Sequence, residues 1–351
     1  MRRLVLHIGD CKTGSTSIQE ALRRGEFTGV RMPLHFPADA NHIPISRAFD
    51  GGDPAPLRDL LNAAGEGITV LSAEHFEFVD PAPLAEAIRR FWPDEITVIA
   101  YARPHAEALF SRYCENVKIG NLRGDAGQFH GAMLNRRRLF YAERFGRWRS
   151  AFGVSFVLRP FASAELVQGD VVADFMEHAI GQGARAGAAL RRNPVPKVEV
   201  LALLRALFDV LGRESESKAA RTALGRNLAR AMVDIGTLVP VMDRKLAEAV
   251  AEAYREDAAE TDRVFFGRPI LSPALTASVD AAAEAPQSLE VGRYFTPETL
   301  AVALAMARTI EPLLAERPGV VSQVLRQNFI KGSPSNARIA QRLRGYDDPS
   351  D

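Results

Sequence analysis

The sequence predicts an α/β fold, namely a three-layer α/β/α sandwich with a central parallel sheet, followed by a largely helical C-terminal half. Short apolar runs recur in the first half of the chain, and each is continuous rather than alternating, which is typical of strands covered on both faces. Segments with helical periodicity separate these runs, so the first half consists of repeated βα units. After Leu158 the pattern is helical and contains no convincing strand.

The predicted strands and helices follow from composition and periodicity. Each strand is rich in Val, Ile, Leu or aromatic residues and is ended by polar or turn residues. The strands are Arg3–Ile8, Ile68–Ser72, Glu95–Tyr101 and Val154–Leu158. The helices are Ser15–Arg24, Pro83–Phe91, Pro104–Ile119, Leu139–Ala151, Asp170–Ile180, Lys197–Leu211, Lys218–Val233, Arg244–Phe265 and Pro297–Leu314. The segment Ser272–Val291, with its prolines and many alanines, is expected to be a surface connection.

Composition narrows the class of protein. The chain has 351 residues, of which 47% are hydrophobic and 25% charged, as in an ordinary globular protein. The formal net charge of +1 gives no field that would gather nucleic acid or an anionic membrane, so any anion site must be built locally. Cys11 and Cys114, the two cysteines, belong to no CxxC or Cys/His cluster, so we expect neither a disulfide framework nor a zinc site.

The location expected for the protein is the cytoplasm. The apolar stretch Leu4–Ile8 behind the basic start is too short for a signal peptide and runs directly into a polar loop. No later run approaches the roughly 20 apolar residues that a membrane span requires. The low cysteine content suits a reducing compartment. No pattern that we recognise sets an oligomeric state.

A glycine-bearing loop follows the first predicted strand and opens the first predicted helix. Its sequence is His7-Ile8-Gly9-Asp10-Cys11-Lys12-Thr13-Gly14-Ser15-Thr16. A strand, a glycine turn and a helix N-terminus present backbone N–H groups and the positive end of a helix dipole to an anion, usually a phosphate. The spacing Gly9-x4-Gly14 is that of a P-loop, but Ser15 stands where a nucleotide triphosphatase has its lysine, and Lys12 lies inside the loop. The cation is therefore placed for a single phosphate group.

The loop resembles the 5'-phosphosulfate-binding loop of sulfotransferases, especially bacterial members. The residues in register are His7, Gly9, Lys12, Thr13, Gly14, Thr16, Ser17 and Gln19. The resemblance implies an enzyme that moves a sulfuryl group from 3'-phosphoadenosine 5'-phosphosulfate (PAPS) to an acceptor hydroxyl and releases PAP. It also implies that Lys12 contacts the phosphosulfate and its bridging oxygen, and that the 5'-phosphate is surrounded by Thr13, Gly14, Ser15 and Thr16. Asp10-Cys11 departs from the family, where a small residue and a proline are common, and this carboxylate should weaken anion binding unless it faces away.

A second phosphate motif follows the third predicted strand. Arg103 and Pro104 lie at the strand end, and Ser111, Tyr113 and Lys118 lie on the next helix. A guanidinium fork and a hydroxyl suit a phosphate when they converge on it. The pattern is similar to the 3'-phosphate site of sulfotransferases, which makes Arg103 and Ser111 expected cofactor contacts and Lys118 a candidate substrate contact. Taken alone, Arg103 would more often be a surface or helix-capping arginine, and its pairing with the glycine loop favours the phosphate site instead.

Sulfuryl transfer also needs a base to take the proton of the acceptor hydroxyl. The second predicted strand delivers Glu74 and His75 to the carboxyl edge of the sheet, where ligands of open α/β sheets bind. Glu74 is the first candidate, because the segment resembles the Ser-x-Glu of carbohydrate and many bacterial sulfotransferases. His75 is the second, since cytosolic small-molecule relatives use a histidine, and His42 is a candidate pocket residue. The alternative for Glu74 is a helix-start carboxylate, and His7, inside the first strand, is expected to be a core histidine.

The resemblance covers about residues 1–270, which we predict to form the α/β domain, with helical elements on the acceptor side from about residue 165. Residues 271–351 are predicted to form a connecting segment, a C-terminal helix and a polar tail. In that tail Lys331-Gly332 is either a late nucleotide contact or simply solvated. Weaker matches to the family are Asn41-His42, Arg159-Pro160-Phe161, Asp174-Phe175 and Arg192-Asn193.

Two other functions stay open at this point. One is a P-loop-like nucleotide kinase, against which the missing Walker lysine argues. The other is a non-catalytic protein that binds PAPS or PAP, which would leave Glu74 without a task. A carbohydrate or glycan-like acceptor is an analogy from the family, and no metal, nucleic acid or membrane span is expected.

Overall fold

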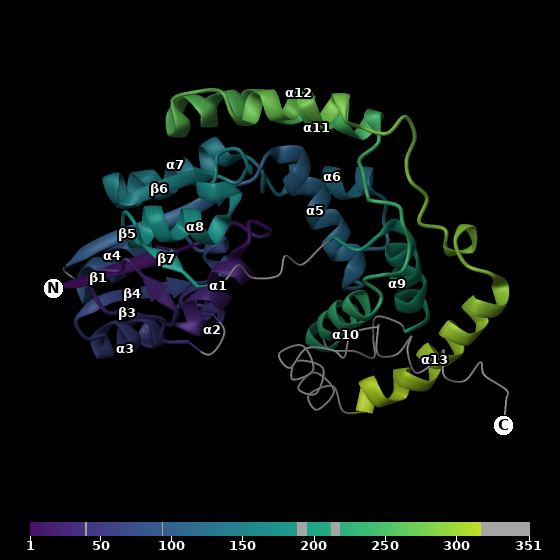
Figure 1. Ribbon diagram of the computed structural model, residues 1–351, viewed down its shortest axis with the longest axis horizontal. Helices are drawn as coiled ribbons and strands as arrows, with labels where there is room; N and C mark the ends of the chain where they lie inside the picture. The colour runs from purple at the N-terminus through teal and green to yellow at the C-terminus, as the bar shows by residue number, and fades with distance from the viewer. Residues whose placement is uncertain (39–40, 93, 188–194, 212–217, 317–351) are drawn as a thin grey trace. The chain divides into compact units, whose positions relative to one another are not determined.

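The chain divides into two compact units. The computed structural model (Figure 1) describes residues 1–38, 41–92, 94–187, 195–211 and 218–316, so Arg192-Asn193 and Lys331-Gly332 lie outside the described residues. The first unit comprises Met1–Leu109, His130–Asn193 and Ala247–Ala281, and the second comprises Phe110–Phe129, Pro194–Leu246 and Ala282–Asp351. Each unit thus consists of three separate stretches of the chain. The predicted boundary near residue 270 instead divides the sequence once, and it stays a prediction.

A five-stranded parallel sheet forms the centre of the first unit. Its strands, in spatial order, are β3 (Leu34–His35), β4 (Gly67–Ser72), β1 (Arg2–His7), β5 (Glu95–Ala102) and β6 (Phe156–Pro160). Every neighbouring pair is parallel. The predicted parallel sheet is confirmed, and the carboxyl ends of its strands share one edge.

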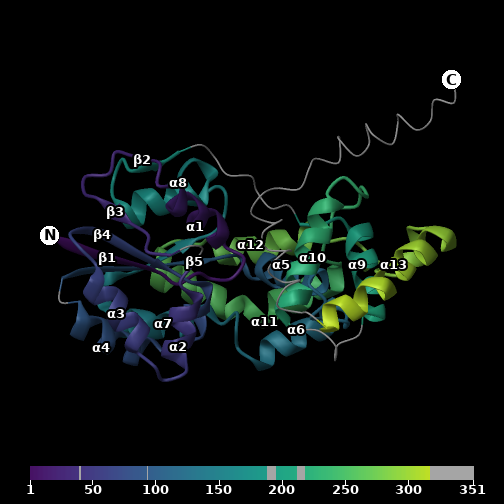
Figure 2. The same ribbon diagram turned by 90° about the horizontal axis from the view of Figure 1, so that it is seen from below.

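Helices cover both faces of this sheet, as Figure 2 shows for the first unit. One face carries α1 (Ser15–Arg24) and α8 (Val171–Phe175), which pack against each other. The other face carries α3 (Ala55–Ala63), α4 (Pro81–Phe91) and α7 (Tyr141–Phe152), and α2 (Ile43–Asp50) packs against α3. The predicted three-layer sandwich is therefore confirmed.

The composition of the central strand explains why both faces are covered. Leu4, Val5 and Leu6 are fully buried at consecutive positions of β1, and such positions point to opposite faces of a sheet. Val5 shares a core cluster with Ile18 of α1 and Phe175 of α8. A strand without a polar face is stable only where other elements cover both faces of the sheet, and a continuous apolar run indicates such a strand.

Some elements differ from the prediction. The expected surface connection over Ser272–Val291 is wrong for its first part, because α12 (Leu271–Asp280) is a helix. Its start is capped by Asp262, which accepts from Leu271 N at 2.8 Å and Ser272 N at 2.9 Å. The antiparallel pair β2 (Phe27–Thr28) and β7 (Arg185–Ala186) was also not expected, because two residues are too few to show a period.

The remaining helices make the second half largely helical, as predicted. The second unit contains α9 (Val198–Val210), α10 (Lys218–Ala231) and α13 (Pro297–Glu316). Their shared core includes Leu204, Phe208 and Leu224. The helices that run across the division between the units are α5 (His105–Lys118), α6 (Ala126–Asn135) and α11 (Arg244–Thr261). Among the described residues, no helix has both the length and the apolarity to cross a bilayer.

A buried carboxylate from late in the chain completes the first unit. Asp257 of α11 accepts from Tyr141 N at 2.8 Å and from Ala142 N at 3.0 Å, at the start of α7. His105 Nε2 lies 2.8 Å from the same carboxylate. Tyr141 Oη in turn donates to Arg103 O at 2.9 Å. The chain that follows β5 and the start of α7 are thus held together by one residue of α11.

Candidate functional site

The glycine loop connects β1 to α1 at the carboxyl edge of the sheet. Its backbone has positive φ angles at Gly9 (97°), Lys12 (70°) and Gly14 (80°). Turns that include such residues orient N–H groups toward a common point and bind anions. Gly14 is the N-cap of α1 and has no side chain with which to cap the helix. Ser17 N already donates to Gly14 O at 2.9 Å, whereas the N–H groups of Ser15 and Thr16 come before the first hydrogen bonds of the helix. The loop therefore has the geometry expected of an anion cradle.

The hydroxyl groups of the loop bind the loop itself. Thr13 Oγ1 donates to Asp10 O at 2.6 Å, and Ser15 Oγ donates to the same carbonyl at 3.4 Å. Both side chains are buried, whereas Thr16 is exposed. Thr13 and Ser15 therefore fix the turn, and we expect their contribution to anion binding to come from the backbone.

Gly14 fits only as glycine. Besides its left-handed φ of 80°, a Cβ at this position would lie 2.6 Å from Val171 Cγ1 and 3.4 Å from Phe161 Cε2. Val171 opens α8 and Phe161 follows β6, so the loop packs directly against two elements of the first unit. Any side chain here would displace the cradle from its support.

Asp10, the departure from the family pattern, forms an ion pair with Arg144 of α7. Arg144 Nη2 donates to Asp10 Oδ2 at 2.7 Å, and Nη1 donates to Oδ1 at 3.4 Å. Asp10 is buried, with 2% of its surface exposed. Cys11 N donates to both Asp10 Oδ1 and Glu77 Oε2, each at 3.1 Å. One guanidinium thus compensates the extra carboxylate of the loop.

Arg103 reaches from the end of β5 to the glycine loop. Its Nη1 donates to Lys12 O at 3.2 Å, and its Nε donates to Glu107 Oε2 at 3.2 Å. The guanidinium also lies 5.5 Å from the ring centroid of Phe161. The structure therefore brings together two motifs that are 91 residues apart in the sequence.

Ser111 and Lys118 lie on the part of α5 that belongs to the second unit. Ser111 is buried, with 8% of its surface exposed. Lys118 Nζ lies 2.5 Å from Glu115 Oε2, one turn earlier on the helix. Because Lys12 and Arg103 belong to the first unit, the convergence of Ser111 and Lys118 with them stays a prediction.

The candidate base lies next to the glycine loop. Glu74 begins a short 3₁₀ helix, Glu74–Phe78, directly after β4. Its Cα is 3.4 Å from the position that a Cβ on Gly9 would occupy. His75 is partly buried, which lowers its pKa, and its ring centroid is 5.3 Å from that of Phe78. The two predicted residues therefore lie at the carboxyl edge, while their roles in proton transfer stay predictions.

Two buried histidines lie around Ser72 at the end of β4. His7 Nδ1 is 2.7 Å from Ser72 Oγ, which also accepts from Gln19 Nε2 at 3.1 Å. His42 Nδ1 accepts from Ser72 N at 3.1 Å. Burial lowers the pKa of His7 to about 3 and that of His42 to about 4. His7 is the expected core histidine, and one ring nitrogen of His42 holds the strand end, so its role in a pocket stays a prediction.

Sequence reasoning missed two residues that bind the loop. Arg144 lies 134 positions after its partner Asp10, and no local pattern distinguishes it from the other arginines of α7. Glu77 lies three residues after Glu74 and is 5% exposed. A signal existed for Glu77, because a carboxylate in the first turn after a buried strand lies at the same edge as the loop.

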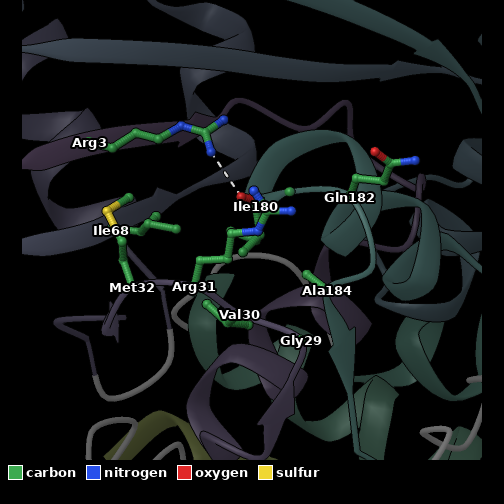
Figure 3. A pocket seen from close by; sticks show the side chains of 10 residues that line it. Arg3, Gly29, Val30, Arg31, Met32, Ile68, Ile180, Gln182 and Ala184 are labelled. Atoms are coloured by element: carbon green, nitrogen blue, oxygen red, sulfur yellow. Dashed lines mark hydrogen bonds between the residues drawn. The ribbon is translucent and has the colours of Figure 1, made fainter.

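A cavity of about 260 Å³ lies at the opposite, amino edge of the sheet (Figure 3). Its lining includes Arg3, Met32, Ile68 and Ile180. Arg3 Nη1 donates to Ile180 O at 2.8 Å, Nη2 donates to Thr97 Oγ1 at 3.0 Å, and Nε lies 3.1 Å from Glu95 Oε1. All three guanidinium nitrogens have a protein oxygen nearby, so this arginine serves the fold.

The fold and the loop together define a parallel α/β protein with an anion-binding geometry at its carboxyl edge. Within the described residues, no group of three or more His, Cys, Asp or Glu side chains is arranged to hold a metal ion. The chain is similar to the crystal structure of a sulfotransferase from Alicyclobacillus acidocaldarius, at 15% identity and a TM-score of 0.42, over 78% of this chain and 98% of that chain. No family model and no curated protein matches the chain.

Proposed function

We propose that the protein is a PAPS-dependent sulfotransferase that transfers a sulfuryl group to a hydroxyl of an acceptor. The observation that carries the proposal is the glycine loop, in which Lys12 precedes Gly14 and Arg103 binds the loop backbone at 3.2 Å. A triphosphate site instead needs a lysine directly after the last glycine to reach the β- and γ-phosphates. A lysine inside the loop suits one phosphate that carries a sulfuryl group.

In this proposal the donor end of the site would comprise the glycine loop together with the predicted phosphate motif of Arg103 and Ser111. PAPS, when bound, supplies the sulfuryl group and the phosphate that leaves with PAP. Lys12 and the N–H groups of Gly14 to Thr16 would hold the 5'-phosphosulfate and stabilise the charge that grows on the bridging oxygen as the S–O bond breaks. Arg103 and Ser111 would hold the 3'-phosphate.

The acceptor end of the site contains Glu74. Its carboxylate takes the proton of the acceptor hydroxyl while the hydroxyl oxygen forms the new bond to sulfur. His75 is the second candidate for this proton transfer, and His42 and Lys118 are candidate acceptor contacts. A carbohydrate or glycan-like acceptor and a cytoplasmic location belong to the same proposal.

Nucleotide selectivity tests the proposal against a kinase. We expect calorimetry to show PAP binding with micromolar or tighter affinity without Mg²⁺, because Lys12, Arg103 and backbone amides supply positive charge. A strong preference for ATP–Mg²⁺ over PAP would instead indicate a P-loop-like kinase. Sulfated products, detected by mass spectrometry after incubation with PAPS and a panel of hydroxyl acceptors, separate an enzyme from a non-catalytic PAPS- or PAP-binding protein.

A further inference from the structure

We propose that Arg144 is a positioning and charge-compensating residue of the glycine loop, which sets the affinity for the donor nucleotide by neutralising Asp10. This inference rests on the proposed function, because it takes the loop to bind the 5' end of PAPS and PAP. It adds a residue of α7, far from the loop in the sequence, to the determinants of donor binding.

The ion pair between Asp10 and Arg144 is internal and well formed. The side chains of Arg144 and Asp10 are 13% and 2% exposed, and their closest atoms are 2.7 Å apart. The Arg144 guanidinium also lies 4.3 Å from the ring centroid of Phe145 and 5.5 Å from that of Tyr141. Two aromatic rings of its own helix thus hold the guanidinium in contact with the loop.

Asp10 is a structural part of the anion cradle. Its carbonyl accepts from Thr13 Oγ1 at 2.6 Å and from Ser15 Oγ at 3.4 Å, and its carboxylate accepts from Cys11 N at 3.1 Å. These bonds keep the carboxylate within the turn from which the loop would hold a phosphate. The charge of Asp10 therefore acts on a bound anion unless an opposite charge compensates it.

The positive charge of Arg144 and the negative charge of Asp10 should have opposite effects on the affinity of the loop for a phosphate. Removing Arg144 takes a guanidinium away from the buried Asp10 carboxylate, so the loop becomes more negative beside a bound phosphate and repels it more strongly. Removing Asp10 leaves an additional cation, and removing both charges restores the original balance. If the ion pair only stabilised the conformation of the loop, removing Arg144 or removing Asp10 would weaken phosphate binding equally, because either change breaks the same contact.

The test compares PAP affinities of four proteins by calorimetry: wild type, Arg144→Gln, Asp10→Asn and the double variant. Arg144→Gln should weaken PAP binding about 10–100-fold, Asp10→Asn should bind PAP at least as tightly as wild type, and the double variant should return to within about threefold of wild type. The recovery in the double variant is the decisive result. Thermal unfolding of each protein, measured beside the binding, separates a loss of affinity from a loss of folded protein.

A matched control comes from the same helix. Arg147 Nη2 pairs with Asp80 Oδ1 at 3.1 Å, with side chains 60% and 55% exposed. Arg147→Gln removes the same charge from α7 and should leave PAP affinity unchanged. If Arg144→Gln does not fold, Arg144→Lys keeps the charge without the two-pronged contact, and it should bind PAP within about threefold of wild type.

The outcomes separate this inference from the proposed function. Equal weakening by Arg144→Gln and Asp10→Asn, with no recovery in the double variant, overturns the inference, as does an Arg144→Gln protein that binds PAP as tightly as wild type. In both cases wild-type PAP binding leaves the proposed function standing. A wild-type protein that does not bind PAP rejects both.

Discussion

Arginines at the two edges of the central sheet have different partners. At the amino edge, Arg3 lines a cavity and donates to the backbone carbonyl of Ile180 (Figure 3). Its guanidinium also contacts Glu95 and Thr97. At the carboxyl edge, Arg103 and Arg144 both bind the glycine loop, one at a carbonyl and the other at a carboxylate. An arginine beside a cavity is therefore a weaker sign of a ligand site than two arginines that converge on a glycine loop at a helix N-terminus.

The largest expected effect belongs to Glu74 at the carboxyl edge. Glu74→Gln keeps the size of the side chain but cannot accept the hydroxyl proton, so kcat should fall about 10²–10⁴-fold while PAP binding is retained. Steady-state kinetics with PAPS and a hydroxyl acceptor, together with PAP calorimetry, check this. Near wild-type turnover, combined with loss of activity in His75→Ala or His42→Ala, would assign the base to a histidine.

Arg103→Ala should weaken PAP binding by about 1.5–3 kcal/mol, the range for hydrogen bonds to charged groups. Adenosine 5'-phosphosulfate lacks the 3'-phosphate and should bind nearly as well to the variant as to wild type. Calorimetry with both nucleotides measures the difference. Because Arg103 also donates to Lys12 O, equal weakening of both would show that it acts through the loop instead.

Gly14 and Gly25 lie at the two ends of α1, and together they separate the steric cost of a side chain in the loop from the cost of a left-handed backbone. Gly14→Ala should lower the unfolding free energy by more than the about 1–2 kcal/mol typical of a left-handed alanine, because its Cβ would lie 2.6 Å from Val171. Gly25, with a φ of 70°, has no heavy atom within 4 Å of the position that an added Cβ would occupy, so Gly25→Ala carries the backbone cost alone. Urea unfolding compares the two. Equal losses of unfolding free energy in the two variants would mean that the Val171 side chain moves away from the added Cβ at little cost.

The amino edge should give the smallest effect on binding. Arg3→Ala removes two hydrogen bonds and an ion pair, and we expect a loss of about 1 kcal/mol or more in unfolding free energy with unchanged PAP affinity. Denaturation and PAP calorimetry on the same sample measure both quantities. A change in PAP affinity beyond about threefold would show that Arg3, at the amino edge, also influences nucleotide binding.

Much of the fold could be predicted because its signals are local. The continuous run through Leu4, Val5 and Leu6 indicates a strand buried on both faces, and the predicted limits of Ser15–Arg24 match α1. The helix α12 escaped prediction because proline and alanine suggested a surface connection. Its cap, Asp262, lies nine residues before Leu271, and the burial of Leu275 depends on tertiary packing that no local pattern records.

The residues of the candidate site that could be predicted are those that follow a strand, because the strand ends place them at the carboxyl edge of the sheet. Lys12, Glu74 and Arg103 each follow a parallel strand, and the topology brings these three ends together. The Asp10–Arg144 pair links positions 134 residues apart, so the compensation of the loop charge becomes visible only in three dimensions. The same holds for Thr13 and Ser15, whose hydroxyl groups bind Asp10 O.

The contacts of Asp257 can form only late in translation. The ribosome releases β5 and α7 well before α11, since Asp257 lies 115 residues after Ala142, whose N–H it accepts. Until Asp257 emerges, His105 and the N–H groups of Tyr141 and Ala142 lack this acceptor, and Tyr141 is the residue that donates to Arg103 O. A nascent chain can therefore contain the whole glycine loop and still lack the final support of the arginine beside it.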